Sequence, residues 1–199
     1  MATEISIANL ALIRLGQQKI SSLSEDNARA EAISIVYEDA RRSVLRSSSW
    51  NFATKRAQLS QNATGPAFAY DYSYNLPADF LKLKRLNSLS TDFRIEGRTL
   101  VSNETPMKIV YIADEKDASL YDGLFVKAFS YRVAADVAKA LVGDESVFVR
   151  MEQGYQEALM EARVTDSLES PPDVSHDPSY LVESRLVDEP FRRIDSGAS

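Results

Sequence analysis

The spacing of apolar residues changes its period twice along the chain, and no other feature of the sequence limits the possible folds as strongly. Near the N-terminus apolar residues recur three and four positions apart, as on one face of a helix. In the middle of the chain they alternate, as in a strand with one buried face. From Asp122 the helical spacing returns, at Phe125, Phe129, Val133, Val137 and Leu141. The order predicted is therefore helix, helix, sheet, helix, helix.

Residues that cap helices divide the helical segments. Thr3 can cap a first helix over about 4–15, and Gly16 stands where a left-handed residue ends a helix. A stripe of Ile33, Tyr37, Ala40 and Val44 predicts a second helix over about 27–48. Gly143 closes the third helix, and the fourth is expected over about 145–167.

The alternating segment predicts a small, largely antiparallel sheet. Tyr70, Tyr72 and Tyr74 alternate, and Pro77 should end a strand or lie at an edge because proline cannot donate to a central ladder. Gly97 marks the turn of a hairpin.

These elements predict an α+β fold. We expect N- and C-terminal helical hairpins to form one bundle domain from residues 1–52 and 114–170, with an inserted antiparallel β domain at 53–113. The remaining segment, 171–199, is predicted to be an extended C-terminal tail, because it holds four of the seven prolines and no sustained period. Its spaced apolar residues could order on a partner surface, and they are Tyr180, Leu181, Leu186 and Phe191.

Composition excludes several kinds of site. The chain has no cysteine, which removes thiol nucleophiles and thiolate metal ligands, and its single histidine, His176, lies in the tail. No glycine-rich phosphate loop follows a strand. We therefore expect no enzyme activity, no metal and no cofactor. No apolar run approaches the ~20 residues of a membrane span, so we also expect a protein with no membrane contact.

Charged residues leave two alternatives open. Four carboxylates of the fourth helix could include an acid/base pair of the kind glycosidases use, although a solvated helix face is the simpler interpretation: Glu145, Glu152, Glu157 and Glu161. The formal net charge of −6 gives no overall basic footprint for nucleic acid.

Basic residues nevertheless cluster along the chain. The candidate interface is Arg41, Arg42, Arg46, Lys55 and Arg56, and a later group is Lys82, Lys84 and Arg85. They fit either a solvated face near a helix C-terminus or a contact with acidic partners or DNA backbone. Trp50 and the three alternating tyrosines fit either core packing or stacking on bases.

Three stretches together resemble the tail tubular protein A, or head-to-tail adaptor, family of short-tailed bacteriophages. They are LIRLGQQKISSLSEDNARAEAISIVYEDARRSVLRSSSWNFATKRAQL, then YNLPADFLKLKRL with RIEGRTL, then VYIADEKDASLYDGLFVKAFSYRVAADVAKAL. The similarity covers roughly residues 5–168 and contains no catalytic signature.

The resemblance implies a structural protein of the virion, located at the head–tail interface and assembled in the host cytoplasm. It implies a dodecameric ring of this chain beneath the portal protein, with the helices toward the portal and the sheet toward the tail nozzle or tail tubular protein B. DNA would pass through without sequence-specific contact, and the tail would embrace neighbouring subunits. The alternatives from other classes are a peptidoglycan-cleaving tail enzyme and a DNA-binding accessory protein.

Overall fold

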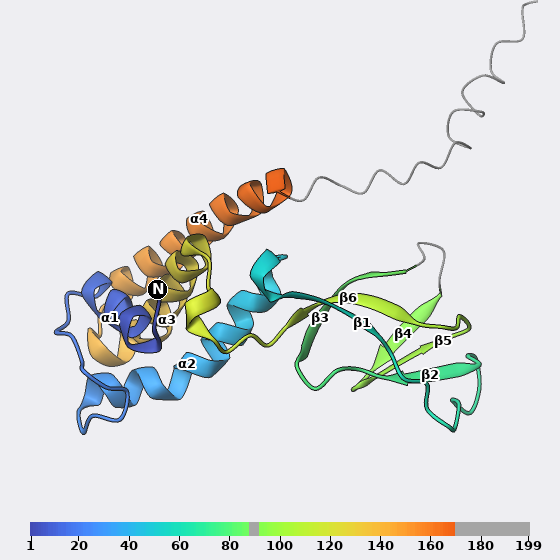
Figure 1. Ribbon diagram of the computed structural model, residues 1–199. Coiled ribbons are helices and arrows are strands. Elements are labelled where there is room, and N and C mark those ends of the chain that lie inside the picture. Colours follow the sequence, from blue (N-terminus) through green and yellow to red (C-terminus); the bar gives the residue numbers. More distant parts are fainter. Residues whose placement is uncertain (88–91, 170–199) are drawn as a thin grey trace, which may run out of the picture. The chain divides into compact units, whose positions relative to one another are not determined.

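The computed structural model describes residues 1–87 and 92–169, which belong to one compact unit, Met1–Glu169 (Figure 1). The helices are α1 (Glu4–Arg14), α2 (Ala28–Ser47), α3 (Gly123–Leu141) and α4 (Glu145–Glu169). The strands are β1 (Thr54–Gln58), β2 (Tyr72–Asn75), β3 (Phe80–Leu86), β4 (Phe93–Glu96), β5 (Thr99–Ser102) and β6 (Lys108–Ala113). Short 3-10 helices lie at Asn51–Ala53 (η1) and Ala118–Leu120 (η2). The predicted α+β class is confirmed.

Local chemistry sets the helix ends as the sequence predicts. The Thr3 hydroxyl accepts a hydrogen bond from the Ser6 backbone N–H at 3.1 Å, and the Ser6 hydroxyl accepts one from the Thr3 N–H at 2.8 Å. This reciprocal pair satisfies donors that the first turn leaves open. Gly16 and Gly143 adopt φ values of +69° and +76°, a conformation in which a side chain would be strained.

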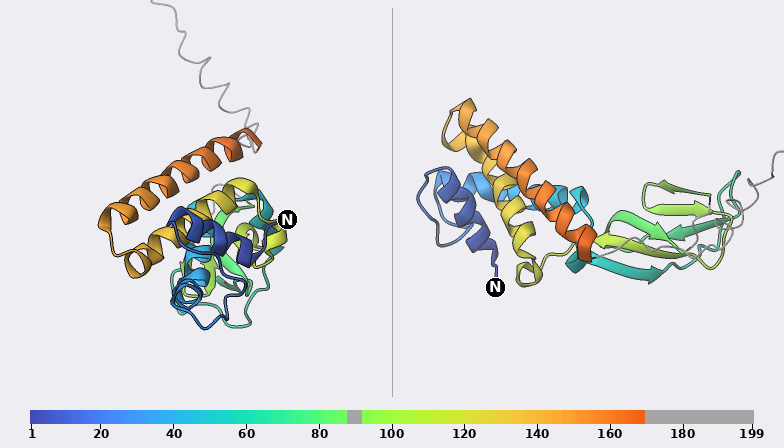
Figure 2. Two further views of the ribbon diagram at one scale, coloured as in Figure 1. Left: turned by 90° about the vertical axis from the view of Figure 1, so that its left-hand side faces the viewer. Right: turned by 90° about the horizontal axis from the view of Figure 1, so that it is seen from above.

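α3 is the central helix of the helical part. It contacts α1, α2 and α4, whereas α1 and α2 make their main helix contacts with α3 and not with each other. Figure 2 shows the four helices grouped together. The prediction of two helical hairpins is therefore not confirmed. Residues on several sides of α3 are buried, and the alanines among them let neighbouring helices approach closely: Phe125, Ala128, Phe129, Val133, Ala134, Ala135, Val137 and Ala138.

The strands form two antiparallel sheets instead of the one predicted. One has the order β1-β6-β3 and the other β2-β5-β4. Both contribute to one hydrophobic cluster, with Tyr74 and Leu100 from the second sheet and Ile109 and Tyr111 from the first. Short strands cannot bury enough apolar surface in a single layer, and two layers enclose a core between them. The predicted hairpin at Gly97 is confirmed as β4–β5, where Ile95 pairs with Leu100.

β6 joins the two cores because its side chains alternate. Ile109 and Tyr111 belong to the core between the sheets, while Ile112 belongs to the core formed by the helices. The proposed division at 53–113 stays a prediction. Within residues 1–87 and 92–169, no helix is long and apolar enough to cross a bilayer.

Candidate functional site

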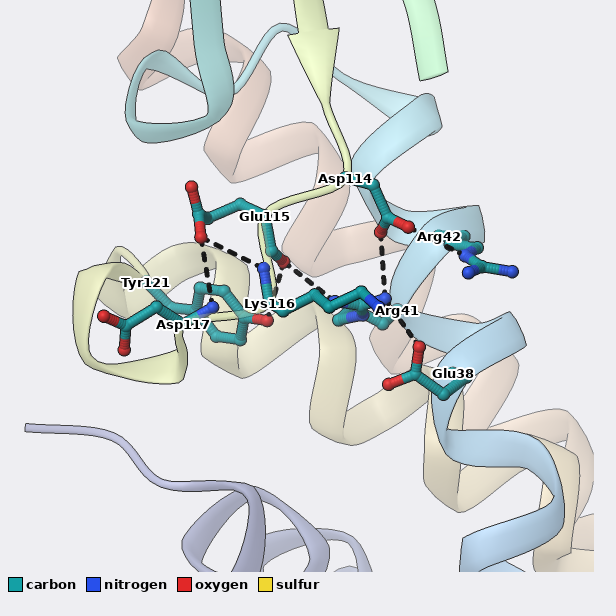
Figure 3. Close-up of polar contacts among 8 residues, drawn as sticks. All are labelled: Glu38, Arg41, Arg42, Asp114, Glu115, Lys116, Asp117 and Tyr121. Carbon is teal, nitrogen blue, oxygen red and sulfur yellow. Dashed lines mark hydrogen bonds and ion pairs between the residues drawn. The ribbon is translucent and has the colours of Figure 1, made fainter. Parts of the chain in front are cut away.

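The predicted basic cluster contributes Arg41, Arg42 and Lys55 to the place where α2 meets the strands. Figure 3 shows two of them, Arg41 and Arg42, beside Asp114. We call this region the junction and define it by Glu38, Arg41, Arg42, Lys55, Asp79, Asp114 and Glu115. Its cations come from α2 and β1, and its acids come from α2, the turn before β3 and the segment after β6. The junction therefore joins parts of the chain that are far apart in sequence.

Arg41 is the centre of the junction. Its Nη1 donates to the Glu115 carbonyl at 3.0 Å, and its Nη2 lies 2.7 Å from Glu38 Oε2 and 2.9 Å from Asp114 Oδ1. Tyr121 donates to the same Glu115 carbonyl at 3.0 Å. Burial raises the pKa of Tyr121, although the nearby Arg41 acts in the opposite direction. The guanidinium is thus held by the fork geometry that arginine offers to oxygen acceptors.

This arrangement corrects the prediction for Arg41. Its side chain is only 1% exposed, so it is not available as an interface residue on the described surface. The reason is its position on the buried stripe of α2, between Tyr37 and Val44, where a charge is tolerated because carboxylates surround it. Its Nε is buried without a hydrogen-bond partner within the described residues.

Arg42 and Lys55 are half-exposed and also paired. Arg42 Nε lies 3.1 Å from Asp114 Oδ2. Lys55 Nζ lies 2.9 Å from Asp79 Oδ2 and 3.8 Å from Glu115 Oε2. The hydrogen bond to Asp79 raises the pKa of Lys55. Burial acts to raise the pKa of Asp79, but the hydrogen bonds from Lys55 and Tyr111 outweigh it, and the pKa is lowered.

Arg46 links the end of α2 to β3 through hydrogen bonds. Its guanidinium donates to the Leu81 carbonyl, and Lys82 Nζ in turn donates to the Arg46 carbonyl at 3.1 Å. A cation beside the last carbonyls of a helix is favoured by the helix dipole. Arg46 remains exposed, but its position is explained by contacts within the chain.

Arg56 differs from the other predicted interface residues. It follows Lys55 in β1 and pairs across the strands with Val110, on the opposite face of the sheet. There it lines a cavity of about 390 Å³ together with Arg85, Lys108 and Val110. Arg56 is exposed and lies outside the junction.

Trp50 and Tyr74 take the core role, whereas Tyr70 is half-buried, belongs to neither core cluster and donates through its hydroxyl to Asp92 at 3.3 Å. Trp50 is 5% exposed, donates through Nε1 to the Val44 carbonyl at 2.8 Å and packs edge-on against Phe125 at 5.0 Å. Tyr74 is buried, and its hydroxyl donates to the Glu104 carbonyl at 2.7 Å. Neither ring offers a face on which a base could stack.

The predicted carboxylates of α4 are either paired with other side chains or exposed. Glu161 lies 2.6 Å from Lys127, and Glu152 accepts from Gln156 at 2.9 Å. Glu145 and Glu157 are exposed on the helix surface. The cavity on the sheet and the one beside Trp50 are lined by other residues. The described residues therefore give no observation that favours the hydrolase alternative.

Other predicted residues lie outside the described part of the chain. These are His176 and the tail residues Tyr180, Leu181, Leu186 and Phe191. Among residues 1–87 and 92–169, no group of three or more His, Cys, Asp or Glu side chains is placed to hold a metal ion.

The sequence reasoning missed the acidic half of the junction. Asp114 and Glu115 directly follow the buried strand β6, and Asp79 directly precedes β3. Acidic residues immediately beside buried strands were a usable signal, since such a residue needs a cationic partner nearby. Which cation each one meets depends on tertiary contacts.

Comparison with known proteins assigns this chain to no family. No protein-family model matches the chain, and no curated protein matches it in sequence. The resemblance to head-to-tail adaptors therefore stays a prediction.

Proposed function

We propose that this chain is a non-enzymatic structural subunit that connects the portal to the tail of a short-tailed bacteriophage. In the proposal, copies of the chain form a ring, with a dodecamer expected, and DNA passes through that ring without sequence-specific contact. The helices face the portal, and the strands face the nozzle or tail tubular protein B. The tail, residues 171–199, contacts neighbouring subunits.

One observation carries the proposal: the order and spacing of the three sequence stretches that resemble the adaptor family. The structure is compatible with treating them as one functional unit, because each stretch supplies residues to the junction. Arg41 and Lys55 come from the first stretch, Asp79 from the second, and Asp114 with Glu115 from the third. A pattern distributed over the chain thus corresponds to one set of contacts in space.

The proposed role needs a subunit whose separate parts keep a defined geometry under load. The junction supports this, because α2 is tied to β3 through Arg46 and Lys82 and to the segment after β6 through Arg41 and Arg42. Rings need interfaces that repeat with one rotation, and a rigid subunit keeps that rotation constant.

The test is a mass measurement with and without the portal protein of the same phage. We expect light scattering to give a free species that becomes a larger complex on mixing, and negative-stain images to show a second ring stacked on the portal. A protein that ignores the portal at every ratio would overturn the proposal. A clear lysis band in a peptidoglycan zymogram, lost on substitution of one α4 glutamate, would favour the hydrolase instead.

A further inference from the structure

The face of α1 that points away from the core is uncharged. Ser6, Leu10 and Ile13 are exposed on it, and Ile13 is 52% exposed. The buried residues of α1 lie on the other side of the helix: Ile7, Ala8, Ala11 and Leu12. A surface helix of a globular protein usually carries charged residues on its solvent side, so this helix is an exception. We call this surface the α1 face and define it by Ser6, Leu10 and Ile13.

A second uncharged surface runs along the side of α4 that points away from the core. Its four exposed residues are spaced four, three and four positions apart, the heptad spacing with which helices pack on each other: Val149, Gln153, Gln156 and Met160. Met160 projects furthest into solvent among the apolar residues of this surface, with 69% of its surface exposed. We call these four residues the α4 row.

α3 holds the two surfaces in a fixed relation. α1 and α4 each make their main helix contact with α3, and they lie on different sides of it (Figure 1). The guanidinium of Arg14, in α1, lies 3.6 Å from the centroid of the Tyr131 ring, in α3. A Cβ added at Gly154, in α4, would lie 2.5 Å from the same ring, so glycine permits this close approach. Each copy of the chain therefore presents the α1 face and the α4 row with the same geometry.

The two surfaces match in length and in shape. The 11 residues of α1 extend over about 16 Å, and the α4 row extends over about 17 Å. A shallow hollow of about 390 Å³ lies on the α1 face, where it is lined by Ser6, Asn9, Leu10, Ile13 and Lys19. Met160 is a projecting, flexible apolar side chain, and such a side chain adapts to an irregular hollow.

The two surfaces also match in charge. Lys19 lies at the hollow, and Glu157 lies one helical turn before Met160. Both are exposed, and neither forms an ion pair with another described side chain. Opposite charges beside an apolar contact select the orientation in which two surfaces meet.

We propose that the α1 face of one copy of this chain packs on the α4 row of the next copy, with Met160 in the hollow and Lys19 beside Glu157. The contact joins two different surfaces, so it is heterologous and can repeat around a ring. It deepens the proposed function by naming the helices through which copies meet, and it rests on that function only for closure of the ring. Two short helices bury little apolar surface, so the contact between two free copies should be weak.

A second copy is favoured over another partner because each surface has its complement on the same chain. The α1 face supplies a hollow and a cation, and the α4 row supplies a projecting side chain and a neighbouring anion. Packing of either surface on itself would bring two Lys19 or two Glu157 side chains to one interface, and like charges there are unfavourable. The contact between unlike surfaces avoids this.

Cross-linking can test the contact specifically, because the chain has no cysteine and a thiol is present only where it is introduced. The full chains with Leu10→Cys and with Met160→Cys are mixed and treated with a bismaleimide. Its reach of about 8 Å matches the distance between the axes of packed helices. The matched control mixture pairs Ile35→Cys with Met160→Cys, because Ile35 is an exposed apolar residue of α2 outside both surfaces. Both mixtures are tested alone and with the portal protein, and circular dichroism melts check that each variant is folded.

We expect the Leu10→Cys and Met160→Cys mixture to give roughly tenfold more covalent dimer than the control mixture, because association raises the effective concentration of the two thiols. Either variant alone should behave like the control. A dimer in equal yield from the control mixture or from one variant alone would overturn the inference. Its absence both with and without the portal would also overturn it.

Charge reversal tests the orientation of the two helices. Addition of Lys19→Glu to the Leu10→Cys chain should lower the yield of dimer by roughly threefold, as expected for loss of an exposed ion pair. Addition of Glu157→Lys to the Met160→Cys chain should then restore the yield. A yield that does not change with Lys19→Glu, or a loss that Glu157→Lys does not reverse, would overturn the proposed orientation.

Portal docking of the same mixtures separates this inference from the proposed function. If the specific dimer forms and the chain does not dock on the portal, copies associate through α1 and α4 and the adaptor proposal fails. If a ring stacks on the portal and no specific dimer forms, the ring uses other surfaces and the inference is wrong, while the adaptor proposal stands.

Discussion

Lys55 and Arg56 are neighbours in the chain and have opposite surroundings. Lys55 points into the junction, where Asp79 and Glu115 hold its ammonium group. Arg56 points to the other side of the sheet, where it lines the cavity with Arg85 and Lys108. Because strand side chains alternate, two adjacent cations of one basic run take different roles. A cluster of basic residues in a sequence therefore does not define one surface.

The two regions should also differ in energy. At the junction, Arg41 is buried and contacts three oxygen atoms. Removal of its charge therefore takes a cationic partner away from carboxylates at a site with little access to water. On the other side of the sheet, solvent screens the exposed Arg56, and loss of its charge should have little effect on stability. Four substitutions test this difference, and they follow in order of the expected loss in the free energy of unfolding, from the largest to the smallest.

The largest effect is expected for Arg41→Met. This change keeps an unbranched side chain but leaves Glu38 without its cation and Asp114 with only the exposed Arg42, so the free energy of unfolding should fall by about 3 kcal/mol. Urea unfolding at equilibrium measures it, and Arg56→Met is the matched control, with an expected change within about 0.5 kcal/mol. Equal losses in the two variants would remove the distinction between the regions.

Asp114→Asn should have the next largest effect. Asp114 is 13% exposed and faces both Arg41 and Arg42, so loss of its charge should cost about 2 kcal/mol. Asp39→Asn is the control, because Asp39 is an exposed residue of α2 outside the junction. A similar cost for both variants would show that the carboxylate of Asp114 contributes no specific contact.

A smaller and pH-dependent effect is expected for Asp79→Asn. The pKa of Asp79 is lowered in the folded chain, so its contribution is complete above its unfolded pKa and is lost as pH falls through the folded value. The carboxyl is 35% exposed, which reduces the expected loss at pH 7 to about 0.5 kcal/mol.

The difference between wild type and Asp79→Asn should therefore begin to shrink below about pH 4 and disappear only once the pH is below the lowered pKa of folded Asp79. Urea unfolding of both proteins across this range measures it. The pKa of Tyr111 gives a second readout. Burial and the hydrogen bond to Asp79 raise this pKa to about 12, so loss of the Asp79 charge should lower it. A difference that stays constant with pH would mean that the charge of Asp79 is not involved.

The smallest effect is expected for Arg42→Ala. Arg42 is 47% exposed, so its pair with Asp114 should stabilise the fold by a few tenths of a kcal/mol at low salt and by less at about 1 M NaCl. Unfolding at both salt concentrations measures this. A loss as large as that of Arg41→Met, or one that does not respond to salt, would contradict the assignment of Arg42 to the solvent-exposed edge of the junction.

Local interactions explain what the sequence by itself determined. The α+β class, the helix boundaries near Thr3, Gly16 and Gly143 and the β4–β5 hairpin at Gly97 all follow from spacing, capping or turn chemistry within a few residues. Such features depend on residues a few positions apart in the chain, so the sequence alone contains the information that sets them.

Contacts between distant segments were decided only by the tertiary structure. It placed α3 against the other three helices, divided the strands into two sheets and brought Asp114 to Arg41, which the sequence had placed in a candidate interface. Alternation predicts that Lys55 and Arg56 face opposite ways, but the side that holds acids depends on where β3 and β6 pack. The physical reason is that a charge is paired or free according to what folding brings within about 4 Å of it.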